Sequence, residues 1–290
     1  MSPQGYYRLS VVALVALWAI VPSGALVRLT ASGLGCPDWP LCEGEVVPAL
    51  TGHAMIEFTN RVFSAVVMGM CILAWIAALR LADRPKAIRV WAGAIALATA
   101  VQVPLGAVTV LTDLHPLMVA SHFLLSMLAL AGGVILVMYA WDRSRGVTRS
   151  VDRRRGPMAA LVALAYGGLL ATGALVTASG PHSGDRDVIR RIWEIDEAAF
   201  VHVRAAVVFL VLAAVLTLWL WREGRVDVLV ARLGAIGAVV VAAQVTVGEY
   251  QYRNALPWEV VLVHVSLAAL GWALIVAIAW GIARPVIARR

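Results

Sequence analysis

The chain has 290 residues, of which 61% are hydrophobic and only 14% are charged, and its formal net charge is +7. Soluble domains carry about 25% charged residues, so a water-soluble protein could not hide this much apolar surface. The positive charge could indicate nucleic-acid binding, but in a membrane protein it more often marks basic cytoplasmic loops.

Eight apolar stretches follow one another along the chain, each close to the roughly 20 residues that a membrane-spanning helix needs. We expect helices at 9–29, 56–79, 88–111, 117–141, 157–178, 198–221, 229–249 and 258–283. The first stretch is too long for a secretory signal, and no small-residue cleavage site is followed by a soluble body, so we expect it to be retained. The predicted fold class is an all-α membrane protein with eight transmembrane helices.

The loops between these stretches differ in charge. Those after the second, fourth and sixth stretches are rich in arginine, as in DRSRGVTRSVDRRR after the fourth. The alternate loops carry the acidic residues Asp38, Asp113 and Glu194, although the loop after the fifth stretch also holds arginines. The positive-inside rule then puts both termini in the cytoplasm. The charge is explained by topology, and we expect no nucleic-acid partner.

The chain also contains an internal repeat. The segment QVPLGAVTVLTDLHPLMVASHFLLSML (102–128) aligns with QVTVGEYQYRNALPWEVVLVHVSLAAL (244–270). One constant offset then pairs Gln102 with Gln244, Gly106 with Gly248, His122 with His264, and Asn60 with His202. A second similarity joins GALVRLTASG (24–33) with GALVTASG (173–180).

This repeat predicts two halves of the same construction. Each half contains an even number of helices, so the two run parallel through the membrane. We expect two pseudosymmetric four-helix bundles, an N-terminal half at 1–145 and a C-terminal half at 146–290, with the arginine-rich segment between them as the boundary.

Three histidines lie inside apolar stretches near their outer ends: His122, His202 and His264. Ionisable residues at membrane depth are costly and tend to be functional, although a hydrogen-bonded histidine at a helix interface is the plainer alternative for any one of them. His202 and His264 lie at matched depth on the second and fourth helices of one half, where bundles hold cofactors. Two imidazoles without nearby cysteine or acid ligands suit a six-coordinate haem better than zinc.

The first half offers a different set of residues. His122 has Asn60 at its partner position, and asparagine is a poor iron ligand. Glu57, Asn60 and Arg61 are spaced so that they share one helix face. Glu57 is either a solvated cap or an acid aimed at whatever His122 binds. The second half therefore resembles a closed site suited to electron transfer, and the first an open site suited to chemistry at a metal.

Two of the three cysteines, Cys36 and Cys42, flank PDWPL in the first outer loop. This spacing outside the cytoplasm is typical of a disulfide or a redox pair, and metal binding is a weaker alternative. Cys71 lies within the second stretch, where we expect it to be a packed apolar residue.

Five segments together resemble the haem A synthase family, and the resemblance covers essentially the whole chain. They are GALVRLTASGLGCPDWPLC (24–42), IEFTNR (56–61), LGAVTVLTDLHPLMVASHFLLSM (105–127), TASGPHSGD (177–185) and the late QVTVGEY segment. The stretch GLGCPDWPLC and the turn LTDLHP are the specific ones. The resemblance implies eight helices in two pseudosymmetric halves. It also implies oxidation of the C8 methyl group of haem O to the formyl group of haem A for cytochrome c oxidase.

The resemblance also implies roles for individual residues. His202 and His264 match the ligands of a haem b in the C-terminal half, and His122 matches a ligand of the substrate haem in the N-terminal half. Glu57 matches the acid considered important for catalysis. Cys36 and Cys42 match the outer-loop cysteine pair, which we expect to form a disulfide.

Two arginines complete the expected substrate site, and two departures from the family qualify it. We expect Arg28 and Arg61 to pair with haem propionates, with interfacial snorkelling as the alternative for each.

Many members have a histidine where this chain has Asn60, which leaves the N-terminal iron more open. Some members have a second cysteine pair in the loop at 179–197, and this chain has none there.

The expected cofactor is haem b, with haem O as substrate and haem A as product. The expected partners are an electron donor such as a quinol, a haem O synthase and membrane lipid. We expect a plasma-membrane location with the haem sites near the extracytoplasmic face. One alternative is a bis-histidine electron-transfer protein of the cytochrome b type, against which Asn60 counts. The other is a transporter built from repeats, which would place its polar groups near the membrane midplane.

Overall fold

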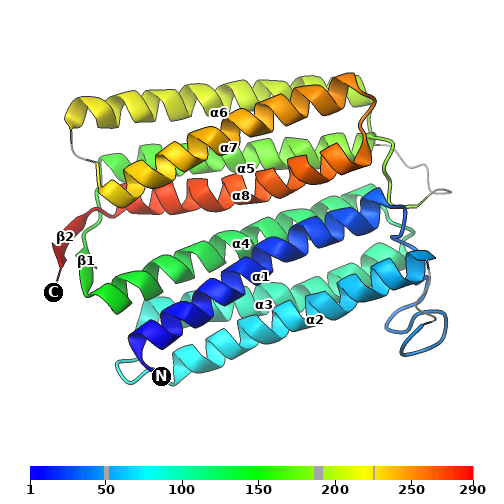
Figure 1. The fold of residues 1–290 in the computed structure, drawn as a ribbon, viewed down its shortest axis with the longest axis horizontal. Coiled ribbons are helices and arrows are strands. Elements are labelled where there is room, and N and C mark those ends of the chain that lie inside the picture. The colour runs from blue at the N-terminus through cyan, green and yellow to red at the C-terminus, as the bar shows by residue number, and fades with distance from the viewer. Residues whose placement is uncertain (49–51, 186–191, 225, 290) are drawn as a thin grey trace.

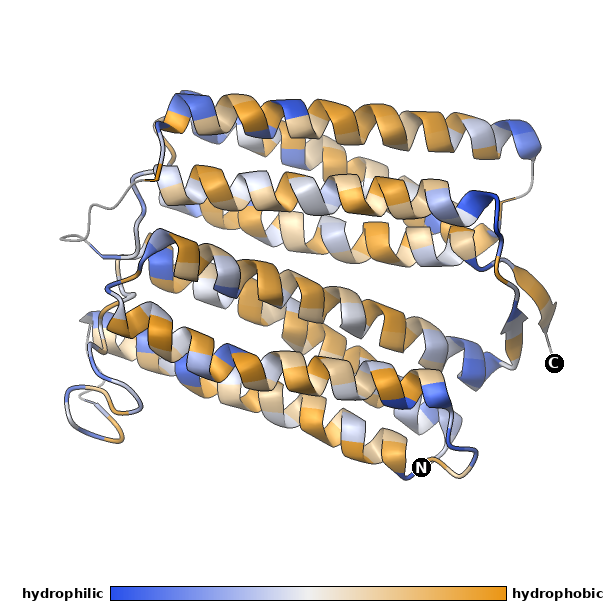
Figure 2. Cartoon of the chain, turned by 180° about the vertical axis from the view of Figure 1, so that it is seen from behind, coloured by the Kyte–Doolittle hydropathy of each residue, from blue (hydrophilic) through white to orange (hydrophobic). Residues whose placement is uncertain are grey.

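The computed structural model describes residues 1–48, 52–185, 192–224 and 226–289. Its body consists of long helices (Figure 1): α1 (Pro3–Leu29), α2 (Gly52–Leu79), α3 (Lys86–Leu111), α4 (Pro116–Arg145), α5 (Arg155–Ser179), α6 (Ile195–Glu223), α7 (Val228–Arg253) and α8 (Trp258–Ala283). All eight are long and apolar enough to cross a membrane, and polar residues gather toward the ends of the body (Figure 2). The chain is a multi-pass membrane protein, and the predicted fold class is confirmed.

Most helices extend beyond the apolar stretches that predicted them. Helix α1 begins at Pro3 because the hydroxyl of Ser2 accepts the N–H of Gly5 at 3.1 Å and so caps the helix. Helix α4 continues to Arg145 and ends where Gly146 adopts a left-handed conformation. Such polar extensions are compatible with a membrane span, since the headgroup region on each side of the hydrocarbon core accepts polar residues.

The helices pack in two groups that differ in arrangement. Helices α1 to α4 form a ring in which α1 packs against α2 and α4, and α3 packs against the same two helices. In the second group α5 packs against α6 and α8, and α7 packs against α8, whereas α6 has an extensive interface only with α5 in the described part of the chain. The pseudosymmetric halves and the cytoplasmic termini stay predictions, although both termini lie at one end of the body (Figure 1).

Two indole N–H groups join these groups of helices within their apolar parts. Trp18 of α1 donates to the Ser266 carbonyl of α8 at 3.3 Å, and Trp272 of α8 donates to the Met127 carbonyl of α4 at 2.7 Å. Hydrocarbon offers no water to replace such bonds. The ring of Trp272 also stacks on Tyr166 with ring centroids 6.0 Å apart.

One small feature was not predicted. Strand β1 (Val147–Arg149) pairs antiparallel with β2 (Val286–Arg289), and thus ties the linker after α4 to the segment after α8. Arg149 forms an ion pair with Asp142 at 2.9 Å and lies over the Trp280 ring, 4.8 Å from its centroid. These contacts explain why an arginine-rich segment adopts a regular structure here.

The turns between α3 and α4 and between α7 and α8 share one backbone geometry. Each places two consecutive residues at positive φ: Asp113 at 50°, Leu114 at 56°, Ala255 at 59° and Leu256 at 58°. The N–H of Leu114 bonds the Thr109 carbonyl at 2.9 Å, and the N–H of Leu256 bonds the Gln251 carbonyl at 2.8 Å. These residues correspond at the constant offset of the sequence repeat. In these turns the repeat is therefore visible in the backbone itself.

Candidate functional site

Three histidines lie about two turns from the start of their helices, at the end of the body that carries the loops after α1 and α5, which we call the loop end. Each ring packs against a glycine of the preceding helix. A Cβ atom added to that glycine would meet the imidazole Cε1 in each case: at 3.5 Å for Gly106 and His122, 3.1 Å for Gly173 and His202, and 3.0 Å for Gly248 and His264. The glycines therefore make room for the imidazoles between helices.

The tautomer of His202 follows from its hydrogen bonds. Thr172 donates its hydroxyl to the Leu169 carbonyl at 2.9 Å. A threonine hydroxyl has one hydrogen, so toward Nδ1 of His202, 3.0 Å away, it acts as the acceptor. The imidazole proton is then on Nδ1, and the lone pair is on Nε2. A histidine ligand to a metal is oriented in this way by the bond of its other nitrogen.

The Nδ1 atoms of His264 and His122 are buried without a hydrogen-bond partner among the described residues. No group of three or more His, Cys, Asp or Glu side chains in the described part of the chain is arranged to hold a metal. The residues thus fit a haem, whose macrocycle supplies four ligands itself, better than they fit a zinc ion.

The first half has Asn60 of α2 at the position that corresponds to His202. Ser23 of α1 donates its hydroxyl to Oδ1 of Asn60 at 2.8 Å. Ser23 corresponds to Thr172, because each directly precedes a GALV segment. A hydroxyl contact is therefore present at both positions, but Ser23 donates to an amide oxygen whereas Thr172 accepts from an imidazole.

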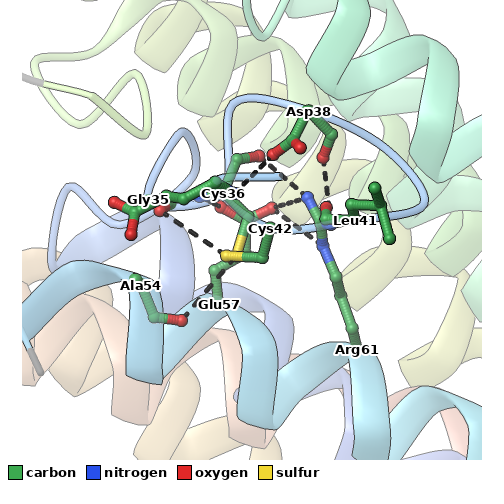
Figure 3. Close-up of polar contacts among 9 residues, drawn as sticks. Gly35, Cys36, Asp38, Leu41, Cys42, Ala54, Glu57 and Arg61 are labelled. Carbon is green, nitrogen blue, oxygen red and sulfur yellow. Dashed lines mark hydrogen bonds and ion pairs between the residues drawn. A yellow bond between two sulfur atoms is a disulfide. The ribbon is translucent and has the colours of Figure 1, made fainter. Parts of the chain in front are cut away.

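Glu57 of α2 lies beneath the first loop at the loop end (Figure 3). Cys36 and Cys42 form the expected disulfide in this loop. One carboxylate oxygen of Glu57 accepts the N–H of Cys36 at 2.8 Å, and the residue is only 5% exposed. Gly35 lets the loop approach α2 closely, since a Cβ atom there would lie 2.5 Å from the carbonyl carbon of His53. The disulfide loop thus covers Glu57.

Arg61, one turn after Glu57, joins the carboxylate to this loop (Figure 3). Its Nη2 and Nε lie 2.6 and 3.1 Å from the other carboxylate oxygen of Glu57. Nη2 also donates to the Cys36 carbonyl at 2.9 Å, and Nη1 donates to the carbonyls of Leu41 and Asp38 at 2.9 and 3.2 Å. Every nitrogen of this guanidinium has a protein partner, so binding a propionate would require it to give up a loop contact.

Asp38 shapes the far side of the disulfide loop. Its carboxylate accepts the N–H groups of Gly44 and Glu43 at 2.8 and 2.7 Å. The bond from Gly44, followed by that from Glu43, holds the pKa of Asp38 below its usual range. A charged Asp38 therefore keeps the loop closed on itself.

Arg28, in the last turn of α1, contacts the second half of the chain. Its Nη1 donates to the His182 carbonyl at 2.5 Å, and Nε2 of His182 lies 2.9 Å from the Leu256 carbonyl. The N–H of Gly33 donates to the Gly184 carbonyl at 2.7 Å. The GPHSGD segment thus bridges the end of α1 and the α7–α8 turn. The other nitrogens of Arg28 have no partner among the described residues and are available to an anion.

Ser23 and Thr172 were missed as site residues. The signal that could have found them is the pair SGALV and TGALV, in which a hydroxyl residue precedes the aligned glycine. The contacts of His182 with Arg28 and with the Leu256 carbonyl were missed as well, because no sequence pattern predicts a hydrogen bond to a main-chain carbonyl of a distant turn.

The fold and these residues define a class: a multi-pass helical membrane protein with three histidines at matched depth near one end. The sequence model of the COX15-CtaA family, cytochrome oxidase assembly protein, matches residues 7–55 and 50–276. The chain belongs to this family of cytochrome oxidase assembly proteins.

Curated relatives carry a more specific name. The heme A synthase of Bacillus pumilus is 29% identical over 148 residues, which is 49% of this chain and 47% of the relative. Those of Alkalihalophilus pseudofirmus and Halalkalibacterium halodurans are each 32% identical, over 149 and 153 residues, covering 51% and 52% of this chain and 50% and 48% of the relatives. The chain spans about half the length of the curated relatives it matches.

Proposed function

We propose that this protein is a haem A synthase, which oxidises the C8 methyl group of haem O to the formyl group of haem A. The observation that carries the proposal is the inequality of the two histidine sites. The second half of the chain has His202 and His264, whereas the first half has His122 with Asn60 at the position that corresponds to His202, and Glu57 on the same helix as Asn60. The family membership and the names of the relatives support it.

In this proposal His202 and His264 hold a haem b, and His122 holds the substrate haem. The bound haems supply redox chemistry at iron, which the protein tunes through ligand identity and burial. Thr172 keeps the lone pair of His202 on Nε2. The glycines beside the three rings admit the imidazoles between helices. Arg28, which has donors to spare, is the better candidate for a propionate, and Arg61 would have to exchange a loop contact.

Glu57 is the proposed acid–base group of the substrate site. In the described conformation Cys36 and Arg61 occupy its two carboxylate oxygens, and the loop above it excludes water. To accept a proton from a reacting group, Glu57 has to exchange one of these contacts. Proton transfer and the position of the disulfide loop are therefore coupled in this mechanism.

We also propose the remaining features that the resemblance implies. The protein would work in the plasma membrane, with the loop end on the extracytoplasmic side. An electron donor such as a quinol would reduce the haem b site, and a haem O synthase would deliver the substrate.

Extraction of the haems from the expressed protein, followed by mass identification, tests the function. We expect haem b together with haem O or haem A in the wild type. The Glu57→Ala variant should retain haem b and form no haem A. Glu249→Gln alters an exposed carboxylate at the loop end and should leave haem A formation unchanged.

Two outcomes would contradict this proposal. Undiminished haem A in Glu57→Ala would remove the role of Glu57. Haem b as the sole haem, bound in both halves, would instead indicate an electron-transfer protein of the cytochrome b type.

A further inference from the structure

The N-terminal half retains a hydroxyl contact like the one that orients His202, but has Asn60 at the position of the histidine. In the C-terminal half, the hydroxyl of Thr172 fixes His202 at 3.0 Å, beside Gly173. In the N-terminal half, the hydroxyl of Ser23 donates to Oδ1 of Asn60 at 2.8 Å. A fixed amide, that of Asn60, thus stands at the position that corresponds to the imidazole of His202.

The hydrogen bond from Ser23 orients the amide. Ser23 donates to Oδ1 of Asn60, which occupies the carbonyl end of the side chain. The amide nitrogen Nδ2 carries two N–H groups and has no hydrogen-bond partner among the described residues. A neutral amide nitrogen has no lone pair to give to iron, whereas its N–H groups are hydrogen-bond donors. The free end of the Asn60 side chain is therefore a hydrogen-bond donor.

The two aligned glycines also differ in their surroundings. A Cβ atom added to Gly173 would come within 3.1 Å of the His202 ring, whereas one added to Gly24, which is exposed, would meet nothing within 4 Å. Asn60 thus has the hydroxyl contact that His202 has, but not the contact with the aligned glycine.

We propose that Asn60, held by Ser23, donates a hydrogen bond to a diatomic ligand on the open face of the iron that His122 holds. The inference rests on the proposed function, because it needs a haem in the N-terminal half. Hydrogen-bond donors and steric access on the open face of a haem decide whether a diatomic ligand binds and how it is polarised. Asn60 thereby distinguishes a ligand-binding haem from the closed haem of the other half.

Carbon monoxide is the probe of this open face. The purified ferrous protein, loaded with haem O, should bind carbon monoxide at the N-terminal haem alone. Asn60→His should close the site, since the new imidazole would be held by Ser23 as His202 is held by Thr172. We expect a second low-spin haem spectrum and a loss of carbon monoxide affinity of about tenfold or more, because an internal ligand acts at high effective concentration.

The donor role has its own readout, the infrared stretching band of bound carbon monoxide. Asn60→Leu removes the N–H groups at similar size, and Ser23→Ala leaves the amide free to rotate. We expect the band to shift to higher frequency in Asn60→Leu and to broaden in Ser23→Ala. Ser23→Thr keeps the hydroxyl and should keep the wild-type band.

The outcomes separate this inference from the function on which it rests. Unaltered carbon monoxide binding in Asn60→His, or an unaltered band in Asn60→Leu, would overturn the inference and leave the proposed function intact. The absence of any haem beyond the one at His202 and His264 in the haem O-loaded wild type would refute both. The reciprocal His202→Asn variant should lose the low-spin haem b spectrum, and its persistence would contradict the correspondence of the two positions.

Discussion

Removal of the Arg61 guanidinium should open the disulfide loop. This side chain makes an ion pair with Glu57 and bonds to three loop carbonyls. In Arg61→Ala the Glu57 carboxylate stays buried without its cationic partner and keeps only main-chain contacts such as the N–H of Cys36. Removing one partner of a buried ion pair costs about 3–5 kcal/mol. Because the Arg61 side chain is 20% exposed, we take the lower end of this range.

A cost of about 3 kcal/mol raises the open population of the loop about a hundredfold. Cys36 and Cys42 are 0% and 1% exposed, so a reductant reaches their disulfide only in the open state. When reclosing is fast, the rate of reduction follows the open population. The assay is reduction of the detergent-solubilised protein by a water-soluble phosphine, with the released thiols counted by mass after alkylation.

Two further variants make the result decisive. Arg253→Ala breaks the exposed ion pair with Glu249 and should leave the rate unchanged, since such pairs contribute little. Glu57→Gln combined with Arg61→Ala leaves no unpaired buried charge, so its rate should lie between those of the wild type and of Arg61→Ala. A rate for Arg61→Ala equal to that of the Arg253→Ala control would refute the reasoning.

Three other predictions concern different parts of the chain. Because the folded loop lowers the pKa of Asp38, the charged carboxylate stabilises the loop at pH values above its unfolded pKa of about 3.9. This contribution is lost as the pH falls through the lower folded pKa. Phosphine reduction should therefore accelerate below about pH 4, and Asp38→Asn should flatten that pH profile. Thr172→Val should lower haem b affinity by about 10–100-fold because His202 loses its orienting partner, and Thr172→Ser should retain it, as measured by transfer of haem to apomyoglobin. Gly271→Ala would place a Cβ atom 2.2 Å from the Tyr166 hydroxyl oxygen and should cost about 1–3 kcal/mol, seen as a lower melting temperature that Tyr166→Phe in the same chain partly restores.

The sequence predicted the features that depend on local composition. A span such as Lys86–Leu111 is found because its apolar run alone is long enough to cross the membrane. The disulfide of Cys36 and Cys42 was expected from their short spacing in an outer loop together with the family resemblance. In each case the residues that matter are neighbours in the chain.

Features that depend on contacts between distant segments could not be predicted in the same way. The spacing of Glu57 and Arg61 placed them on one helix face, but their partners are main-chain groups of the loop after α1, which no side-chain pattern encodes. Strands β1 and β2 are short and come from opposite ends of the second half of the chain. The Thr172 contact was missed because threonine in an apolar helix is common and its bond to His202 depends on how α5 and α6 pack.

The hydrogen bonds from the Trp18 and Trp272 indoles, which join the two groups of helices, bear on how haems and electrons would reach the sites. They join α1 and α4 to α8 with hydrogen bonds that lipid cannot replace. In the proposed function, a haem would therefore enter from a lipid-facing flank. Electrons passing between the two groups of helices would cross packed protein, so their rate would be set by distance.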